Sequence, residues 1–412
     1  MPENAKKPQI RFKGFTDAWE QRKLGDLCSE IGDGLHSAPI YDEKGSYFFI
    51  NGNNLVNGKI IIDENETKKV SQNIFNDNNK NLDNTTLLLS INGTIGNLAY
   101  YQGEQVMLGK SAAYLKCKFV DKTYLYGVLQ TNLILKSFMA SLTGTTIKNL
   151  GLEVIKNTYI FSPKVNEQVK IGKYFHNLDN LITLHQRKLD KLKNIKKSML
   201  EKMFPKNGSN VPEIRFTGFT DAWEQRKLNN YLIVSDEKNS ENLYKKEDVL
   251  SVSGDFGIVN QIEFQGRSFA GTSVLNYGVV HKGDVVYTKS PLKATPYGII
   301  KTNKGSTGIV SVLYGVYHTK ENANADFIQV YFEQNARLNN YLRPLVNKGA
   351  KNTLLISDEE ALNGEVNFAP SLNEQLKISV VFNSIDNLIT LHQRKLEKLQ
   401  NIKKACLEKM FV

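Results

Sequence analysis

Two long stretches of the chain carry apolar residues at the three- and four-residue spacing of an amphipathic helix. We predict one helix over 163–206 and a second over 370–412, each starting at a proline and free of glycine and proline over 173–204 and 371–411. A spacing sustained this long is typical of a coiled-coil-like seam. We expect the seam between the two helices to contain Ile182, His185, Leu189, Leu192 and Met199 from the first and Ile389, His392, Leu396, Leu399 and Cys406 from the second.

The chain is duplicated at the edges of each half. Residues 179–204 and 386–411 are identical at 22 of 26 positions, and residues 9–24 and 213–228 at 14 of 16. The repeat predicts two equivalent frames related by a pseudo-two-fold axis. Both tryptophans, Trp19 and Trp223, lie at the same place in the opening blocks. We expect each to form a small apolar plug with neighbouring phenylalanines; stacking on nucleic-acid bases is the alternative.

Between the repeated blocks lie two segments that barely resemble each other. Both contain short runs with strand character, such as 47–50 and 85–91 in the first and 284–288 and 297–301 in the second, separated by Asn-Gly and Gly-Asp turns. Residues 124–142 and 324–342 read as helices. We therefore predict a mixed α/β fold. Two recognition domains, 1–162 and 213–369, are joined by the long helices 163–206 and 370–412 and a linker at 207–212.

The charge of the chain favours a polyanionic partner, with nucleic acid as the first candidate. Lys and Arg number 53 against 42 Asp and Glu, which gives a net charge of +11. Within 179–204 the count is seven basic against three acidic residues, and within 386–411 it is six against three. These charges indicate either a solvated helix face or nonspecific contact with phosphates.

Composition also indicates the compartment. The three cysteines are an odd number without CxxC spacing, which predicts neither a disulfide framework nor a zinc site. The first ten residues contain no apolar run, and no stretch is apolar enough to cross a bilayer. We expect a cytoplasmic protein.

Catalytic signatures are missing from the sequence. Residues 103–111 resemble a phosphate-binding loop but have five residues between the glycines where four are required, and the following residues read as a strand. There is no glycine-rich adenosylmethionine loop, no amino-methyltransferase tetrapeptide and no His/Cys cluster for a metal. We expect no catalytic residue, no metal site and no cofactor bound by this chain.

Polar and basic residues gather at predicted loop tips at matching places of the two unique segments. Lys and Asn side chains can read guanine and adenine edges, while Thr and Ser can bind phosphates. Ordinary surface loops are the alternative. The candidate DNA-binding residues are Asn92, Thr94, Lys110, Thr145, Thr146, Lys148 and Asn149 in the first segment and Lys289, Ser290, Lys293, Lys348, Lys351, Asn352 and Thr353 in the second.

The opening RFxGFxxxW block, the two variable segments and the repeated helices ending in LEKMF together resemble the DNA-specificity subunit of type I restriction–modification systems. The resemblance covers essentially the whole chain, and its lysine- and asparagine-rich composition is similar to that of staphylococcal members. It implies that each variable segment is a target-recognition domain and that the long helices pack antiparallel as a spacer. Because the two segments differ, the target is expected to be bipartite and asymmetric.

The resemblance also implies partners. Two methyltransferase subunits are expected on the spacer helices, and restriction–translocase subunits can join them on double-stranded DNA. S-adenosylmethionine, ATP and Mg²⁺ then belong to those partners.

Two rival hypotheses remain at this point. The chain could be a stand-alone DNA methyltransferase or nuclease, which predicts methylation by the purified chain alone. It could instead be a coiled-coil scaffold that does not read DNA, which predicts no sequence-dependent binding of duplex DNA.

Overall fold

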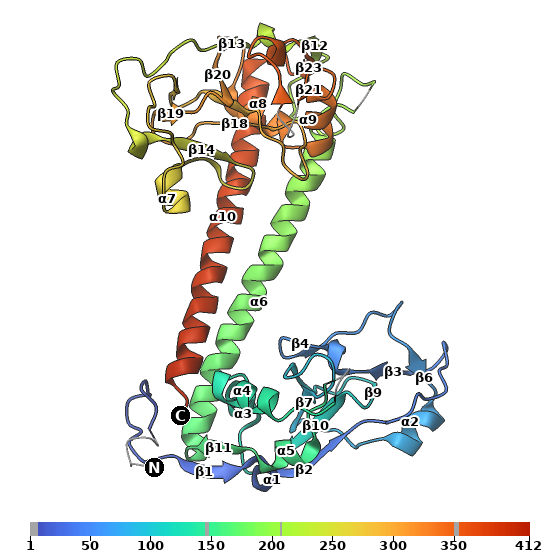
Figure 1. The fold of residues 1–412 in the computed structure, drawn as a ribbon. Coiled ribbons are helices and arrows are strands. Elements are labelled where there is room, and N and C mark those ends of the chain that lie inside the picture. Colours follow the sequence, from blue (N-terminus) through green and yellow to red (C-terminus); the bar gives the residue numbers. More distant parts are fainter. Residues whose placement is uncertain (1–6, 145–147, 207, 350–353) are drawn as a thin grey trace. The chain divides into compact units, whose positions relative to one another are not determined.

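The computed structural model describes residues 7–144, 148–206, 208–349 and 354–412, which divide into two compact units. Unit 1 contains the residues up to Arg187 together with Gln393–Val412, and unit 2 contains Lys188–His392. Each long helix therefore contributes one part to unit 1 and the other part to unit 2 (Figure 1). The predicted domains, by contrast, kept each helix as a segment of its own.

Unit 1 is built on a four-stranded antiparallel sheet of order β2-β10-β7-β8. A second sheet, β6-β3-β9, pairs β3 with β9 in parallel, and β1 pairs with β11. The strands are β1 Glu20–Lys23, β2 Cys28–Asp33, β3 Tyr47–Ile50, β4 Leu55–Val56, β5 Lys59–Ile60, β6 Lys69–Val70, β7 Thr86–Ser90, β8 Leu98–Tyr100, β9 Val106–Leu108, β10 Ala112–Cys117 and β11 Tyr159–Ser162. The helices are α1 Leu24–Leu27, α2 Gln72–Asn78, α3 Lys122–Leu129, α4 Asn132–Ala140, α5 Leu152–Asn157 and the start of α6 Val165–Lys202.

Unit 2 has a four-stranded antiparallel sheet of order β13-β20-β17-β18 and the ribbons β12–β23, β14–β15, β16–β19 and β21–β22. Its strands are β12 Glu224–Lys227, β13 Leu232–Val234, β14 Leu250–Ser253, β15 Gly257–Asn260, β16 Gly278–Val280, β17 Val285–Thr288, β18 Ile299–Thr302, β19 Gly308–Val310, β20 Tyr314–Thr319, β21 Asn347–Lys348, β22 Leu354–Leu355 and β23 Glu365–Phe368. Its helices are α7 Gln261–Gln265, α8 Ala325–Phe332, α9 Asn335–Leu342 and the start of α10 Leu372–Lys409.

The two unmatched segments share one topology. In unit 1 the strand order is β2-β10-β7-β8, and in unit 2 it is β13-β20-β17-β18. In both sheets the strand that comes last in the sequence lies between the first strand and a hairpin formed by the other two. A two-stranded ribbon then closes each segment onto the repeated frame: β1 with β11 in unit 1 and β12 with β23 in unit 2. The mixed α/β prediction is confirmed.

The predicted helices over 124–142 and 324–342 are each divided into two in the structure. The first breaks between α3 and α4, where the Thr131 hydroxyl donates to the Val128 carbonyl at 2.8 Å and its N–H bonds the same carbonyl. The second breaks between α8 and α9 at Glu333, whose N–H bonds the Val330 carbonyl. Bonds of this i to i−3 type close a helix turn early, which a pattern of apolar residues does not reveal.

Each tryptophan of the opening blocks is buried in an aromatic cluster, which confirms the predicted burial. Its ring partners come from elsewhere in the chain and not from the phenylalanines of its own block. Trp19 is 1% exposed and lies edge-on to Tyr124 and Phe411, with ring centroids 6.0 and 6.5 Å away. Such edge-to-face contacts add to the free energy of burying the rings. The alternative of base stacking is wrong for this ring, because no face of it reaches the surface.

Unit 2 repeats this cluster with equivalent residues. Trp223 is also 1% exposed, and its ring centroid lies 5.7 Å from those of Phe204 and Phe327. Phe204 lies two residues beyond the end of α6, as Phe411 lies two residues beyond the end of α10. The end of α6 therefore belongs to the core of unit 2, and the end of α10 to the core of unit 1.

A buried ion pair ties each opening block to the start of a long helix. Arg11 donates from Nε and Nη2 to the two carboxylate oxygens of Glu167, both at 2.7 Å. The hydrogen bonds to Glu167 raise the Arg11 pKa above its ordinary value. Arg215 and Glu374 make the same two-bond contact at 2.6 and 2.8 Å in unit 2. The two-bond geometry fixes orientation as well as distance.

The glutamine that follows each of these glutamates anchors the helix to the unique segment. Gln168 accepts from the Asp121 N–H at 2.8 Å, just before α3, and donates to the Pro163 carbonyl at 2.8 Å. Gln375 accepts from the Asn324 N–H at 2.9 Å, just before α8, and donates to the Ala369 carbonyl at 2.9 Å. The Asn-Glu-Gln sequence shared by the two halves is thus a structural joint.

Ile10 meets the end of α10 in unit 1 as Ile214, after the linker, meets the end of α6 in unit 2. The Ile10 N–H donates to the Lys409 carbonyl at 2.9 Å, and the Ile214 N–H donates to the Lys202 carbonyl at 2.9 Å. Nine residues connect Phe204 to Ile214. Fusing Val412 to Met1 would place ten residues between Phe411 and Ile10.

We therefore expect a circular permutant to fold. With Val412 fused directly to Met1 and the chain opened between Gly208 and Ser209, every contact of both frames is retained and only the covalent junction moves. Thermal unfolding should occur within a few degrees of the parent chain. A matched permutant opened inside β17, between Val286 and Tyr287, should fail to fold because it cuts a buried strand. Equal stability of the two permutants would contradict this account of the frame.

Candidate nucleic-acid interface

In unit 1 the structure brings together two loops that are separate in the sequence. The Leu150 N–H donates to the Ile91 carbonyl at 2.9 Å, and Asn92 lies in a β-bridge with Asn149. Asn149 also exchanges two backbone hydrogen bonds with Thr143, at 2.9 and 3.0 Å. The loop after β7 and the loop before α5 therefore form one joined surface.

The predicted contact residues on this joined surface differ in what they present. Lys148 and Thr94 are exposed, and Asn149 is half-buried. Thr94 shares a hydrogen bond of 3.1 Å with Ser90. The carbonyl oxygen of the Asn92 side chain is buried without a hydrogen-bond partner. Asn92 consequently cannot offer both its acceptor and its donor to an adenine edge in this conformation. Thr145 and Thr146 lie outside the described residues.

Lys110 lies on the turn between β9 and β10 and is exposed. Next to it, Ser111 donates to the Asn51 side-chain oxygen at 2.9 Å and accepts from the Gly52 N–H at 2.8 Å. The residues after the turn form strand β10, which confirms the strand predicted there and disagrees with a phosphate-binding loop. The turn can present one cation beside a polar network but has no helix behind it to hold a phosphate.

In unit 2 the loop between β17 and β18 holds the matching candidates. Lys293 is exposed near the tip of the loop, and Ser290 is half-buried. Lys289 lies at the base, with its Nζ 2.8 Å from Asp358 Oδ1. Lys348 belongs to strand β21, while Lys351, Asn352 and Thr353 lie outside the described residues.

The residues predicted for the helix seam are buried or half-buried, and none of the ten is exposed. Leu189 is the most buried of them, at 4% exposure. In unit 1, Leu399 and Cys406 pack against the core, and Cys406 Sγ lies 3.4 Å from the Tyr174 hydroxyl. In unit 2, Met199 packs against the core. The histidines His185 and His392 are half-buried.

A lysine–aspartate pair joins the two helices within each unit. In unit 1, Lys403 of α10 lies 2.7 Å from Asp179 of α6. In unit 2, Lys196 of α6 lies 2.5 Å from Asp386 of α10. Together with the contact between Tyr174 and Cys406, the unit 1 pair shows that the two helix segments run antiparallel there.

Besides the aspartate, each lysine has a second partner, and this partner differs between the units. Lys196 also contacts Glu333 at 2.6 Å, whereas Lys403 donates to the amide oxygen of Gln130 at 2.6 Å. Burial opposes the charge of Lys196, but Glu333 and Asp386 outweigh it and raise the Lys196 pKa above its ordinary value. Burial, followed by the charge of Glu333, raises the pKa of Asp386.

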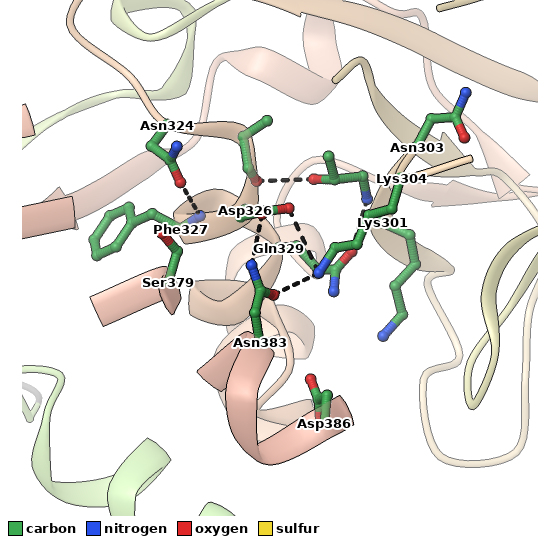
Figure 2. A network of polar contacts seen from close by, with 12 residues as sticks. Lys301, Asn303, Lys304, Asn324, Asp326, Phe327, Gln329, Ser379, Asn383 and Asp386 are labelled. Carbon is green, nitrogen blue, oxygen red and sulfur yellow. Dashed lines mark hydrogen bonds and ion pairs between the residues drawn. The ribbon is translucent and has the colours of Figure 1, made fainter. Parts of the chain in front are cut away.

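A second polar network in unit 2 joins α10 to α8 and to the residues that follow β18 (Figure 2). Asn383 of α10 donates to Asp326 of α8 at 2.7 Å and accepts from Lys304 at 2.6 Å. These residues satisfy one another. We interpret the network as a joint between α8, the end of β18 and α10, not as a ligand site.

The described residues contain no cluster of His, Cys, Asp and Glu arranged to hold a metal ion, and no helix among them is long and apolar enough to span a membrane. Cys28 and Cys117 are partners in the β2–β10 register, and both are free and buried. A hydrogen bond to Cys28, followed by burial, raises the Cys117 pKa. A protonated, buried thiol is a poor nucleophile.

Comparison with known proteins finds similarity to one kind of DNA-specificity protein. Residues 16–194 match the family described as the type I restriction modification DNA specificity domain. The chain is 23% identical over 432 aligned residues to a protein of Methanocaldococcus jannaschii named as the MjaX type I restriction enzyme specificity subunit, covering 98% of this chain and 94% of the relative. Over residues 16–194 the chain is therefore similar to this domain family, and along almost its whole length it is similar to a type I specificity subunit.

One further curated relative and one solved structure are also similar to the chain. The MjaVIII specificity subunit of the same organism is 28% identical over 196 residues, which cover 46% of this chain and 42% of that relative. The crystal structure of the specificity subunit from M. genitalium superposes with a TM-score of 0.62 at 14% identity and covers 98% of this chain and 99% of its own. The latter likeness shows the fold.

These likenesses confirm the resemblance drawn from the repeated frame. The curated relatives are named as specificity subunits, which favours that function over the rival hypothesis of a stand-alone methyltransferase or nuclease. Sequence reasoning missed Arg11 and Glu167, although both recur once in each half and could have been found by that signal. It also missed Asp358, for which no local signal exists.

The Lys196 joint yields a testable difference between two equivalent lysines. Lys196→Met leaves the carboxylates of Glu333 and Asp386 facing each other with less compensation, and should destabilise the chain by about 3 kcal/mol. Lys403→Met removes a lysine that faces one carboxylate and one amide, and should cost less. Chemical unfolding of both variants measures the difference. Equal losses would show that the second carboxylate does not matter.

Proposed function

We propose that this specificity subunit reads an asymmetric, bipartite site on double-stranded DNA, with one half-site read by each unit. The supporting observation is that the two units share one sheet topology and have loops at matching places, but the residues of those loops differ. The loop after β7 in unit 1 corresponds to the loop after β17 in unit 2, and their residues, 91–97 and 289–298, are unrelated. Different side chains on equivalent loops select different base pairs.

The exposed cations on these loops suit contact with the DNA backbone. Lys110 and Lys148 of unit 1 and Lys293 of unit 2 are exposed. Phosphate contacts fix the register of a protein on the duplex, and neighbouring polar side chains such as Asn149 then read base edges. The net charge of +11 supports association with the polyanion.

The repeated helices supply the spacer and the docking sites in this proposal. Their length sets the separation of the two half-sites, and their outer faces receive two methyltransferase subunits. In unit 1, Leu181 and Leu184 are 44% and 45% exposed; in unit 2, the equivalent Leu388 and Leu391 are both 45% exposed. Equivalent exposed leucines offer equivalent apolar surfaces to two copies of one partner.

The chemistry then resides in the partners. S-adenosylmethionine is bound by the methyltransferase subunits, and ATP and Mg²⁺ by restriction–translocase subunits that join the complex. The complex acts on genomic DNA in the cytoplasm. The specificity subunit contributes the recognition of the DNA sequence and sets the spacing between the two half-sites.

Exchange of one unique segment tests the proposed reading of DNA. Replacing residues 25–158, which lie between the paired strands β1 and β11, with the segment of a similar specificity subunit should change one half of the methylated site only. Replacing 229–364, between β12 and β23, should change the other half. Mapping of methylated adenines in cells expressing the complete system measures both outcomes. A change in both halves from one exchange would contradict the proposal.

Charge substitutions at the exposed leucines test the docking surfaces. Leu184→Glu and Leu391→Glu should each reduce the number of bound methyltransferase subunits from two to one, because each removes one of two equivalent apolar patches. The double variant should bind none. Native mass spectrometry counts the subunits, and Lys191→Glu, at an exposed position of the same helix, is the control. Retention of two subunits by the double variant would place docking elsewhere.

A further inference from the structure

Two lysines of one loop in unit 2 have opposite surroundings. Lys293 is exposed near the tip of the loop between β17 and β18. The side chain of Lys289, at the base, is only 14% exposed and its Nζ lies 2.8 Å from Asp358 Oδ1. Lys289 is therefore already paired in the absence of DNA, and Lys293 is the better placed of the two to meet a phosphate.

The loop that carries both lysines is anchored at several points. The Lys289 N–H donates to the Leu313 carbonyl at 2.9 Å, and Leu292 and Thr295 exchange two backbone hydrogen bonds across the tip. Asn339 of α9 donates to the Ala294 carbonyl at 3.2 Å. Gly298 ends the loop at φ +98°, where an added Cβ would lie 2.0 Å from the Thr288 carbonyl oxygen. The loop is thus held in one shape.

Asp358 belongs to a different segment, which follows the β21–β22 ribbon. Two hydrogen bonds join the residues on either side of it. The Ser357 N–H donates to the Glu360 carboxylate at 2.8 Å, and the Glu360 N–H donates to the Ser357 hydroxyl at 3.1 Å. Asp358 Oδ1 also lies against β20, because a Cβ added to Gly315 would be 2.5 Å from it. The carboxylate is therefore fixed where Lys289 can reach it.

We propose that Lys289 and Asp358 are positioning residues for the half-site read by unit 2. Their ion pair joins the loop 289–298 to the segment 354–358 and so sets where the exposed Lys293 and the β21–β22 ribbon meet the DNA. Lys289 itself does not contact a phosphate. This inference rests on the proposed reading of DNA by both units.

In unit 1 the corresponding loops are joined by a different kind of bond. There the two equivalent loops are joined through the backbone, by the Leu150 N–H and the Ile91 carbonyl at 2.9 Å and by the bridge between Asn92 and Asn149. A joint made of backbone does not depend on side-chain charge. Removal of the Lys289–Asp358 ion pair should therefore affect only the half-site that unit 2 reads.

The salt dependence of binding separates a positioning lysine from a contacting one. The salt slope, meaning the magnitude of the slope of log K against log salt, falls by about 0.9 for each phosphate contact that is lost. The charge of Lys289 is neutralised by Asp358, so its removal should leave the slope unchanged. Removal of Lys293 should lower it.

The test uses the chain assembled with its methyltransferase subunits and duplex DNA that carries the site found by methylation mapping. The variants are Lys293→Ala, Lys289→Met, Asp358→Asn and the reversed pair Lys289→Asp with Asp358→Lys. We expect Lys293→Ala to lower the slope by about 0.9. Lys289→Met and Asp358→Asn should keep the slope and reduce discrimination about tenfold at the unit 2 half-site alone. The reversed pair should restore discrimination.

Several results would overturn the inference. Lys289→Met could lower the slope as much as Lys293→Ala, which would make Lys289 a phosphate contact. Discrimination could remain unchanged in both Lys289→Met and Asp358→Asn, or fall equally at both half-sites, which would indicate a merely structural role. Asp358→Asn preserves side-chain size and decides the question if Lys289→Met does not fold. Absence of any bipartite methylated site for the unaltered chain would instead refute the proposed function.

Discussion

The buried arginine–glutamate pair is the contact on which each half of the molecule depends. In unit 1 the Arg11 guanidinium and the Glu167 carboxylate are both removed from water, which is costly unless each charge finds its partner in good geometry. The two-bond contact meets that condition, and it holds the opening block against the first turn of α6. The next residue, Gln168, then extends the joint to the start of α3. Losing either charge would leave the other buried and unpaired, so the joint tolerates little change.

Because the frame closes on itself, the segment inside it can vary. The ribbon β1–β11 brings residues 20–23 beside 159–162, so the unique segment of unit 1 leaves and re-enters the frame at one place. The ribbon β12–β23 does the same in unit 2. The enclosed sheets keep one strand order while their loops differ in sequence and in the bonds that join them. A constant frame with replaceable loops suits the proposed function, in which the partners stay the same while the DNA target changes.

The duplication also determines how the long helices are shared. The end of α6 packs in the core of unit 2 and the end of α10 in the core of unit 1, so each unit combines the start of one helix with the end of the other. Lys196 and Lys403 occupy equivalent positions of the repeat and pair with the equivalent aspartates Asp386 and Asp179. Neither half can complete its core from its own sequence, which makes the pairing of the two halves a condition of folding.

The sequence by itself determined the features that recur locally: the helical periodicity, the repeated frame, the burial of Trp19 and Trp223, and the resemblance to type I specificity subunits. Periodicity reports which face of an element is apolar, and a repeat reports which residues share an environment. Tertiary structure decided the pairs that lie far apart. Glu167 is 156 residues from Arg11. Asp358 sits in a segment that no pattern connects to Lys289.

Tertiary structure also decided which predicted loop residues are available to DNA. Lys148 and Lys293 are exposed, while the Asn92 carbonyl is buried and the Lys289 charge is paired. In the sequence these four residues look alike, because each is a polar residue in a predicted loop. Their availability depends on the segment that packs beside them, and that neighbour comes from a distant part of the chain. Packing between distant segments, which no local pattern encodes, is the physical reason for the difference.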